Sequence, residues 1–323
     1  MAGVTNPGPP RRVALTGPTG SLGALLLPRL IADEGVESVL TLGLRAPPPE
    51  NSGKVSFQTL DLSRPDAEGT LTAALTDGKI DALFHLALLL GPIHDPALAH
   101  ELEVVGTLQV LSAVSRAQVA RLILPSFTML YGARGEKPAV LPETATLHGC
   151  PASRFVTDRV RVEQEVALFA ERHPGTLVRV LRFAPVLGRT VDNPATRLLR
   201  RAVVPTLLGF DPLWQCLHEE DAGAALHLAL RGAKGGPFNI VGRGTLPLSA
   251  VIHEAGSQSL PLPTPLARAA LRALNGLGVT SVPLNLLDYF RYSWVADGEK
   301  ARQGLGFTPR YNTREAAASI RGS

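Results

Sequence analysis

Cysteine is scarce in this sequence, which has Cys150 and Cys216 and no others among its 323 residues. The two lie far apart, and neither belongs to a group with the spacing of metal ligands. This argues against a disulfide framework and against a zinc site, and we predict no metal. Such cysteine usage is typical of the reducing cytoplasm, where we expect the protein.

Long apolar segments are also missing. The longest uncharged apolar run covers residues 82–92, is interrupted by His85, and is too short to span a bilayer. Residues 1–12 are rich in Gly and Pro and lack the apolar core of a signal peptide, so we expect a flexible tail there. We predict no membrane partner.

Charge of one sign is never concentrated along the chain. There are 32 Lys and Arg against 28 Asp and Glu, a net charge of +4, and the arginines are scattered without interleaved aromatics. Nucleic-acid binding is therefore not expected. With 323 residues, 45% of them hydrophobic, the chain can bury the core of one large or two modest domains.

Glycine marks the most informative stretch, VALTGPTGSLG at residues 13–23, where an apolar run meets Gly17, Gly20 and Gly23. This pattern predicts a strand, a tight turn and a helix over residues 13–32. Gly17 would permit the turn, Gly20 would let backbone amides approach a pyrophosphate, and Gly23 would let the helix pack on the strand. An ordinary glycine-rich turn between a strand and a helix is the alternative.

Strand-like and helix-like segments alternate after this stretch. Further strands are predicted at 38–44, 55–60, 81–86, 121–125 and 176–182, and helices at 66–76, 96–118 and 152–172. The segment 81–86 is apolar throughout, which is typical of a parallel strand buried on both faces. The alternation predicts an α/β protein with a Rossmann-type, doubly wound parallel sheet.

The composition changes after Gly188, where Pro, Leu and Arg mix and the elements shorten. We therefore expect a dinucleotide-binding domain over 13–188. A smaller, mostly helical substrate-binding domain is expected over 189–212 and 242–323. Residues 213–241 are predicted to return to the main sheet.

With these landmarks, the chain resembles the extended short-chain dehydrogenase/reductases, also called the NAD-dependent epimerase/dehydratase family. Its TGxxGxxG motif is matched from Thr16 to Gly23, and its acidic pair by Asp61-Leu62. Further matches are His85-Leu86-Ala87, Val105-Gly106-Thr107, Tyr131-Gly132, Leu181-Arg182-Phe183, Leu187-Gly188, His218–Asp221, Phe238-Asn239 and LGFTP at 305–309. The cofactor-binding residues that the resemblance implies are Thr16, Gly17, Thr19, Gly20, Ser21, Leu22, Gly23, Asp61, Leu62, Leu86, Ala87 and Pro185.

The sequence departs from this family at its catalytic positions. Members use a Ser or Thr, a Tyr that exchanges a proton with the substrate, and a Lys four residues later. These positions hold Phe127, Phe155 and Arg159, and the Asn expected before the Gly-Thr pair is Glu103. Phe has no proton to exchange, whereas Arg159 can still donate to ribose hydroxyls and is kept as a cofactor-binding residue.

The catalytic residue is therefore unknown. Thr128 neighbours the missing Ser/Thr position, but adjacent side chains of a strand face opposite sides, which favours a structural role. His94 and His148 lie in loops near the expected cleft and are the other weak candidates for a general acid.

The end of the second strand informs the choice of cofactor. An acidic residue there would accept hydrogen bonds from the adenosine ribose and repel a 2′-phosphate, but the chain has Leu44 followed by Arg45. Because Arg forms charge-assisted bonds to phosphate, we predict NADP(H) over NAD(H). A solvated Arg45 is the alternative.

Leu88, Phe127 and Phe155 are expected to line an apolar pocket for a planar aromatic ligand. In this respect the chain is similar to the atypical reductases of aromatic-polyketide antibiotic pathways. The first hypothesis is an NADPH-dependent ketoreductase, monomeric or homodimeric, acting on a hydroxylated aromatic ketone with a proton from substrate or water. A catalytically silent NADP(H)-binding regulator or scaffold is the alternative, and no residue favours a non-redox isomerase or lyase.

Overall fold

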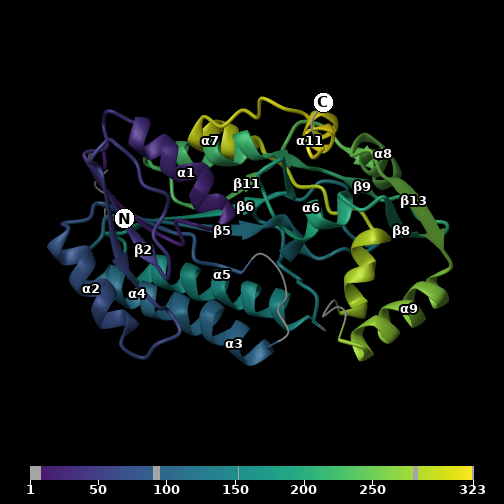
Figure 1. Ribbon diagram of the computed structural model, residues 1–323, viewed down its shortest axis with the longest axis horizontal. Helices are drawn as coiled ribbons and strands as arrows, with labels where there is room; N and C mark the ends of the chain where they lie inside the picture. Colours follow the sequence, from purple (N-terminus) through teal and green to yellow (C-terminus); the bar gives the residue numbers. More distant parts are fainter. Residues whose placement is uncertain (1–8, 90–94, 152, 279–282, 322–323) are drawn as a thin grey trace.

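The fold is a doubly wound α/β structure, seen in a computed structural model that describes residues 9–89, 95–151, 153–278 and 283–321. Within these residues, seven parallel strands form one sheet in the order β11-β6-β5-β4-β1-β2-β3 (Figure 1). Their bounds are Arg12–Thr16 (β1), Ser38–Gly43 (β2), Val55–Thr59 (β3), Ala82–His85 (β4), Arg121–Phe127 (β5), Leu177–Phe183 (β6) and Gly236–Ile240 (β11). The predicted fold class is confirmed.

Helices cover both faces of the sheet. On one face α1 (Ser21–Ala32) packs against α7 (Glu219–Leu228), and on the other α2 (Ala67–Asp77), α4 (Gly106–Arg116) and α5 (Arg154–Arg172) lie in a row (Figure 1). Each layer has its own apolar core, because consecutive residues of a strand point to opposite faces. Thus Leu15 belongs to the core under α1, while Ala14 belongs to the core under α2 and α4.

The helix predicted over 96–118 is divided into three parts. It consists of α3 (Pro96–His100), a π-helical turn η1 (Glu101–Val105) and α4. At the junction the Gly106 amide donates to the carbonyl of Glu101, five residues earlier. Although Ala97–Arg116 is long and apolar enough to cross a membrane, 50% of it is buried inside the protein, where it packs as a core helix. Glu103 lies within the π turn, and its side chain is buried.

Most of the remaining elements form a second layer beyond the carboxyl ends of the strands, whereas α10 (Glu299–Leu305) packs beside β11 against the core of the main sheet. Strands β8 (Val203–Leu207) and β13 (Gln258–Leu262) pair in parallel, and β9 (Leu213–Trp214) pairs with β12 (Leu246–Pro247). The other elements of this layer are α6 (Pro194–Leu199), α8 (Leu248–Glu254), α9 (Thr264–Gly276), η3 (Leu284–Phe290) and α11 (Thr313–Ala318). Aromatic residues, scarce overall, gather in its core, where Trp214 meets Trp294 edge to face.

Candidate active site

The predicted site residues follow the carboxyl ends of neighbouring strands. In the parallel register Thr16 of β1 pairs with Leu42 of β2 on one side and with His85 of β4 on the other, and Phe127 at the end of β5 pairs with Phe183 of β6. Residues that follow these positions therefore meet along one edge of the sheet. In doubly wound folds this edge is where ligands bind.

The glycine turn depends on two of its three glycines for steric reasons. Gly17 has a φ of +67°, and a Cβ there would lie 2.7 Å from the backbone of Ala87. A Cβ on Gly23 would lie 2.3 Å from the carbonyl oxygen of Gly17 and 2.8 Å from that of Pro18. The expectation that Gly23 permits packing on the strand needs correction, because its close contact is with the turn itself.

The start of α1 fits a pyrophosphate. Gly20 caps the helix without a side chain, and a Cβ there would meet only the Gly17 carbonyl oxygen, at 3.4 Å, among the described atoms within 4 Å. The first turn carries no acidic residue, Thr19 is exposed and Ser21 is half-buried. Amides of the first turn thus face an open position where the helix dipole favours an anion.

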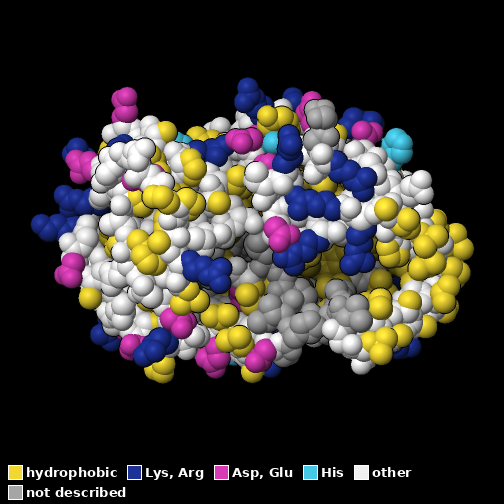
Figure 2. Space-filling model, in the orientation of Figure 1, with side chains coloured by type: hydrophobic (Ala, Val, Ile, Leu, Met, Phe, Trp, Pro, Cys, Tyr) yellow, Lys and Arg dark blue, Asp and Glu magenta, His cyan; other side chains and the backbone are white. Residues whose placement is uncertain are grey.

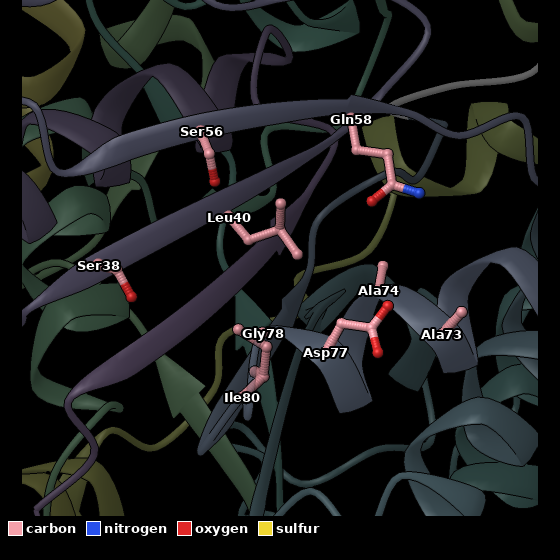
Figure 3. Close-up of a pocket in the computed structure, with 9 residues that line it drawn as sticks. All are labelled: Ser38, Leu40, Ser56, Gln58, Ala73, Ala74, Asp77, Gly78 and Ile80. Carbon is pink, nitrogen blue, oxygen red and sulfur yellow. The ribbon is translucent and has the colours of Figure 1, made fainter.

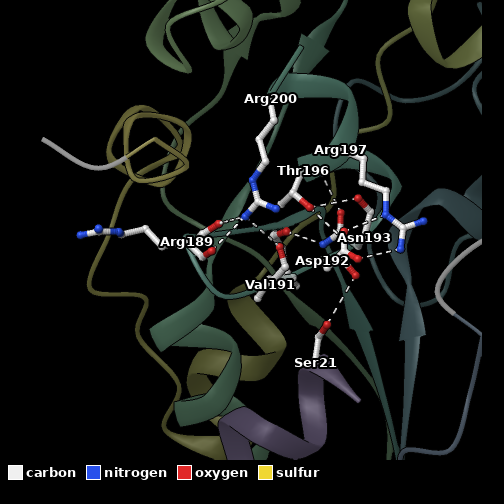
Figure 4. Close-up of polar contacts among 10 residues, drawn as sticks. Ser21, Arg189, Val191, Asp192, Asn193, Thr196, Arg197 and Arg200 are labelled. Atoms are coloured by element: carbon white, nitrogen blue, oxygen red, sulfur yellow. Dashed lines mark hydrogen bonds and ion pairs between the residues drawn. The ribbon is translucent and has the colours of Figure 1, made fainter. Parts of the chain in front are cut away.

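A loop that sequence reasoning missed contacts the first residue of this helix. After β7 (Val186–Leu187) the chain passes Ser21, whose hydroxyl donates to the carbonyl of Asp192 at 3.5 Å (Figure 4). The buried carboxylate of Glu219 accepts from the amides of Arg189, Thr190 and Val191, each at 3.0 Å. The Arg200 guanidinium donates to three carbonyls of the same loop, those of Gly188, Arg189 and Val191.

The motif residue Gly188 explains how Glu219 reaches the loop. A Cβ at Gly188 would lie 2.1 Å from the Glu219 Cδ, so only glycine leaves room for the carboxylate. Leu187-Gly188 and the acidic residues at 219–221 are both visible in the sequence. No feature of the sequence indicates that Gly188 and Glu219 are in contact. Glu219, the first residue of α7, thus holds the loop at residues 189–191 in place.

His85 is a core residue with satisfied nitrogens. Its Nδ1 lies 2.9 Å from the Thr16 hydroxyl and its Nε2 lies 3.3 Å from the Thr107 hydroxyl. Because Thr107 donates to the Glu103 carbonyl at 2.6 Å, Nε2 is the protonated nitrogen and Nδ1 accepts from Thr16. Burial, with a smaller effect of Arg159, lowers the pKa of His85 to about 3, so the ring is neutral.

The residue in place of the family lysine forms a buried ion pair. Arg159 Nε lies 2.7 Å from Oε2 of Glu103, and each side chain is only 2% exposed. The guanidinium also donates to the carbonyl of Leu89, while the amide of Leu89 donates to Glu103. Burial raises the pKa of Glu103, and the charge of Arg159 opposes this rise.

Two phenylalanines cover this ion pair. The Arg159 guanidinium carbon lies 5.1 Å from the ring centroid of Phe127 and 5.7 Å from that of Phe155. The guanidinium of Arg159, which was predicted to donate to ribose hydroxyls, is thus enclosed, and its charge is directed at Glu103. The four departures from the family pattern thus form one contiguous cluster.

The other predicted cofactor residues lie along the same edge. Asp61 accepts from the amide and the hydroxyl of Ser63, bonds that lower its pKa. Leu22, Leu62 and Leu86 are buried, while Pro185 is half-buried. After β2, Leu44 is 69% exposed and Arg45 is exposed as well, so both are open to an adenosine moiety.

Two of the three weak catalytic candidates, Thr128 and His148, lie within the described residues. Thr128 lies in the 3-10 turn η2 (Thr128–Tyr131) rather than on a strand, and its buried hydroxyl donates to the Phe183 carbonyl at 3.4 Å. This correction to the expected strand supports a structural role. His148 is exposed, and His94 lies outside the described residues.

Lys137 is a titratable group that sequence reasoning did not single out. Its ammonium contacts the carbonyl of Gly132, directly after η2. Burial and the charge of Arg134 lower the pKa of Lys137 to about 8. A lysine with this pKa exchanges protons near neutral pH, and no motif in the sequence marks it.

Tyr131 belongs to a buried polar network that joins strands. Its hydroxyl donates to Asn239 of β11 at 2.8 Å and accepts from Arg182 of β6 at 2.8 Å. Arg182 also pairs with Glu163 of α5 at 2.6 Å, both side chains being 7% exposed. The Tyr131 hydroxyl is thus engaged with buried partners on two strands, which gives this motif residue a structural role.

Two cavities lie away from the glycine turn. One, of about 250 Å³, lies between β2, β3 and the end of α2, where strand side chains such as Leu40 and Gln58 point toward Asp77 (Figure 3). The described residues that line it include none of the predicted site residues. The other, of about 10 Å³ beside Arg159 and Glu163, has room for about one water.

The parallel sheet and the glycine turn define a dinucleotide-binding protein of the Rossmann class. The model of the NAD dependent epimerase/dehydratase family matches residues 13–241, more than half of the chain. The chain belongs to this family, whose members depend on a nicotinamide dinucleotide, and membership supports an oxidoreductase.

Individual relatives agree with this assignment. An uncharacterised protein of Mycobacterium tuberculosis is 30% identical over 317 residues, covering 95% of this chain and 82% of its own length. The dTDP-6-deoxy-L-talose 4-dehydrogenase (NAD(P)(+)) of Kitasatospora kifunensis is 28% identical, covering 96% of this chain and 95% of its own. The UDP-glucose 4-epimerase structure of Thermotoga maritima has a TM-score of 0.73 at 19% identity, covering 96% and 97%, and shows the fold alone.

Proposed function

We propose that this protein is an NADPH-dependent ketoreductase that acts without the Ser, Tyr and Lys of its family. One observation carries the proposal: the cluster of Glu103, Phe127, Phe155 and Arg159 has neutral rings where proton donors would lie, and its only charges neutralise each other. Such a wall can hold a carbonyl group but cannot protonate it. The name of the Kitasatospora relative, a dehydrogenase, supports interconversion of a carbonyl and an alcohol.

The first turn of α1 would hold the pyrophosphate through its amides, and Arg45 would meet a 2′-phosphate. Arg45 is exposed, and the structure shows no ion pair for it among the described residues. Its guanidinium can therefore form charge-assisted bonds to phosphate without breaking others. This supports NADP(H) over NAD(H).

The substrate that fits best is a planar, hydroxylated aromatic ketone of polyketide type, such as an angucyclinone. Half-buried apolar side chains pack against the core that contains Phe155, namely Leu89, Phe127, Met129, Leu286, Phe290 and Tyr292, and Leu88 is half-buried as well. Flat rings bury much apolar area against such side chains. Leu90 and the rest of 90–94 lie outside the described residues.

The reaction needs one hydride and one proton. When bound, reduced nicotinamide supplies the hydride that adds to the carbonyl carbon. The carbonyl oxygen, which gains the electron pair of the broken π bond, takes its proton from a neighbouring hydroxyl of the substrate or from water. The protein contributes orientation over an apolar surface rather than an acid.

The test is NADPH oxidation at 340 nm by the purified protein with a hydroxyaryl ketone whose hydroxyl is hydrogen-bonded to the carbonyl. The control is the same ketone as its methyl ether, which we expect to be reduced at least about tenfold more slowly, because one strong donor is lost. Tight NADPH binding without turnover of either ketone would favour the catalytically silent regulator instead. Equal reduction rates for the ketone and its methyl ether would contradict substrate-assisted protonation. If the pH–rate profile then has a break near pH 8 that Lys137→Met abolishes, the proton comes from Lys137.

Arg45→Ala tests the cofactor preference separately. We expect it to weaken NADPH binding by about ten- to a hundredfold, the usual range for a lost charge-assisted bond, and to leave NADH binding nearly unchanged. Fluorescence titration with both dinucleotides measures this. NADH binding more tightly than NADPH to the unaltered protein would refute the preference.

A further inference from the structure

We propose that Glu103 and Arg159 are positioning residues that hold the segment Ala87–Leu89 against the glycine turn, and that Arg159 is not a ribose ligand. The inference rests on the proposed dinucleotide site. It assigns a role to two residues that depart from the family pattern at separate places in the sequence.

The first step is that one ion pair binds both backbone groups of one residue. The amide of Leu89 donates to Glu103 Oε1, and the carbonyl of Leu89 accepts from the Arg159 guanidinium. The two side chains are joined at 2.7 Å between Nε and Oε2 and at 3.1 Å between Nη2 and Oε1. Leu89 lies beyond the end of β4, so no strand pairing fixes its backbone, and the ion pair does so instead.

The second step connects Leu89 to the glycine turn. Ala87, two residues earlier, packs so closely on Gly17 that a Cβ there would lie 2.7 Å from its backbone. The Ala87 amide also donates to the Thr16 hydroxyl at 3.3 Å. A displacement of Leu89 would therefore move the segment that packs against the turn beside the start of α1.

The third step concerns why the guanidinium stays where it is. Phe127 and Phe155 lie over it, and its exposure is 2%. Turning it toward a ligand would leave Glu103 as an unpaired buried charge, which is strongly unfavourable. A lysine at this position could pair with Glu103, but its ammonium has a single nitrogen and cannot also reach the Leu89 carbonyl as a guanidinium does.

The test replaces both charges at once by Glu103→Met with Arg159→Met. Replacing a buried ion pair by apolar groups of similar volume often leaves stability unchanged, whereas the bonds to Leu89 are lost. We expect at least about tenfold faster hydrogen exchange of the Leu89 amide and at least about tenfold weaker NADPH binding. The matched control is Glu163→Met with Arg182→Met, which removes a similarly buried pair from α5 and β6. In the control we expect both quantities to stay within about threefold, because that pair neighbours Arg159 but neither of its side chains hydrogen-bonds to Leu89.

Arg159→Lys serves if the double variant does not fold. Because lysine keeps the pairing with Glu103 but releases the Leu89 carbonyl, we expect faster Leu89 exchange and weaker NADPH binding. Binding as tight as in the unaltered protein would overturn the proposal, because the bond to the Leu89 carbonyl would then not support the dinucleotide site. Weaker binding with unchanged Leu89 exchange would also overturn it, because residue 159 would then act on the dinucleotide without moving Leu89. Hydrogen exchange of the Leu89 amide is measured without cofactor, so it decides whether the ion pair holds Leu89 even if no dinucleotide binds. A protein that binds no dinucleotide would refute the proposed function instead.

Discussion

Gly23→Ala is the substitution that most sharply tests the geometry of the glycine turn. In an exposed helix, Gly to Ala stabilises by about 0.5–1 kcal/mol. At Gly23 the added Cβ would lie 2.3 Å from the Gly17 carbonyl oxygen, and Cβ atoms essentially never approach below 3.0 Å, so the turn and the helix must separate by roughly 0.7 Å or more. Overpacking of this kind costs about 1–3 kcal/mol, which exceeds the gain in helix propensity.

Gly69→Ala is the matched control, because Gly69 lies in α2 with nothing within 4 Å of an added Cβ. We expect Gly69→Ala to raise the free energy of unfolding and Gly23→Ala to lower it by about 1–2 kcal/mol, both measured by urea denaturation. Gly23→Ala should also weaken NADPH binding in a fluorescence titration, because the first-turn amides move away from the turn. An unfolding free energy for Gly23→Ala equal to that of Gly69→Ala, with unchanged binding, would refute the reasoning.

Three further predictions follow from buried groups. His85 has a pKa of about 3 when folded and 6.5 as its ordinary value, so the unfolded chain binds the extra proton between these values. Stability is therefore lost as the pH falls from 6.5 toward 3, by up to about 1.4 kcal/mol per pH unit, and His85→Asn should flatten this slope in urea titrations at several pH values. Glu219→Ala should destabilise by about 3 kcal/mol or more in thermal or urea unfolding, because three loop amides lose their acceptor. Cys216, whose pKa burial raises to about 12, should resist alkylation in the folded protein and react only after unfolding, as followed by mass spectrometry.

The parallel sheet could be predicted from the sequence because each pattern that indicates it involves only neighbouring residues. Apolar runs, helix periods and the glycines at 17 and 23 each depend on a few neighbouring residues, and right-handed connections then leave few possible arrangements. The π turn at 101–105 was not predictable, because it interrupts an otherwise regular helical pattern by one residue. The sequence likewise indicated that proton donors are missing at residues 127 and 155.

Only the tertiary structure shows that the residues which depart from the family pattern interact with one another. Glu103 and Arg159 are 56 residues apart in the chain, and no periodicity couples them, so their pairing and their common hold on Leu89 emerge only when η1 and α5 pack. Glu219 and the loop after Gly188 meet for the same reason. By itself, the sequence determined the fold, the glycine turn and the absence of the usual acid. Whether a charged residue faces a ligand or a buried partner depends on packing between distant elements, which local sequence does not encode.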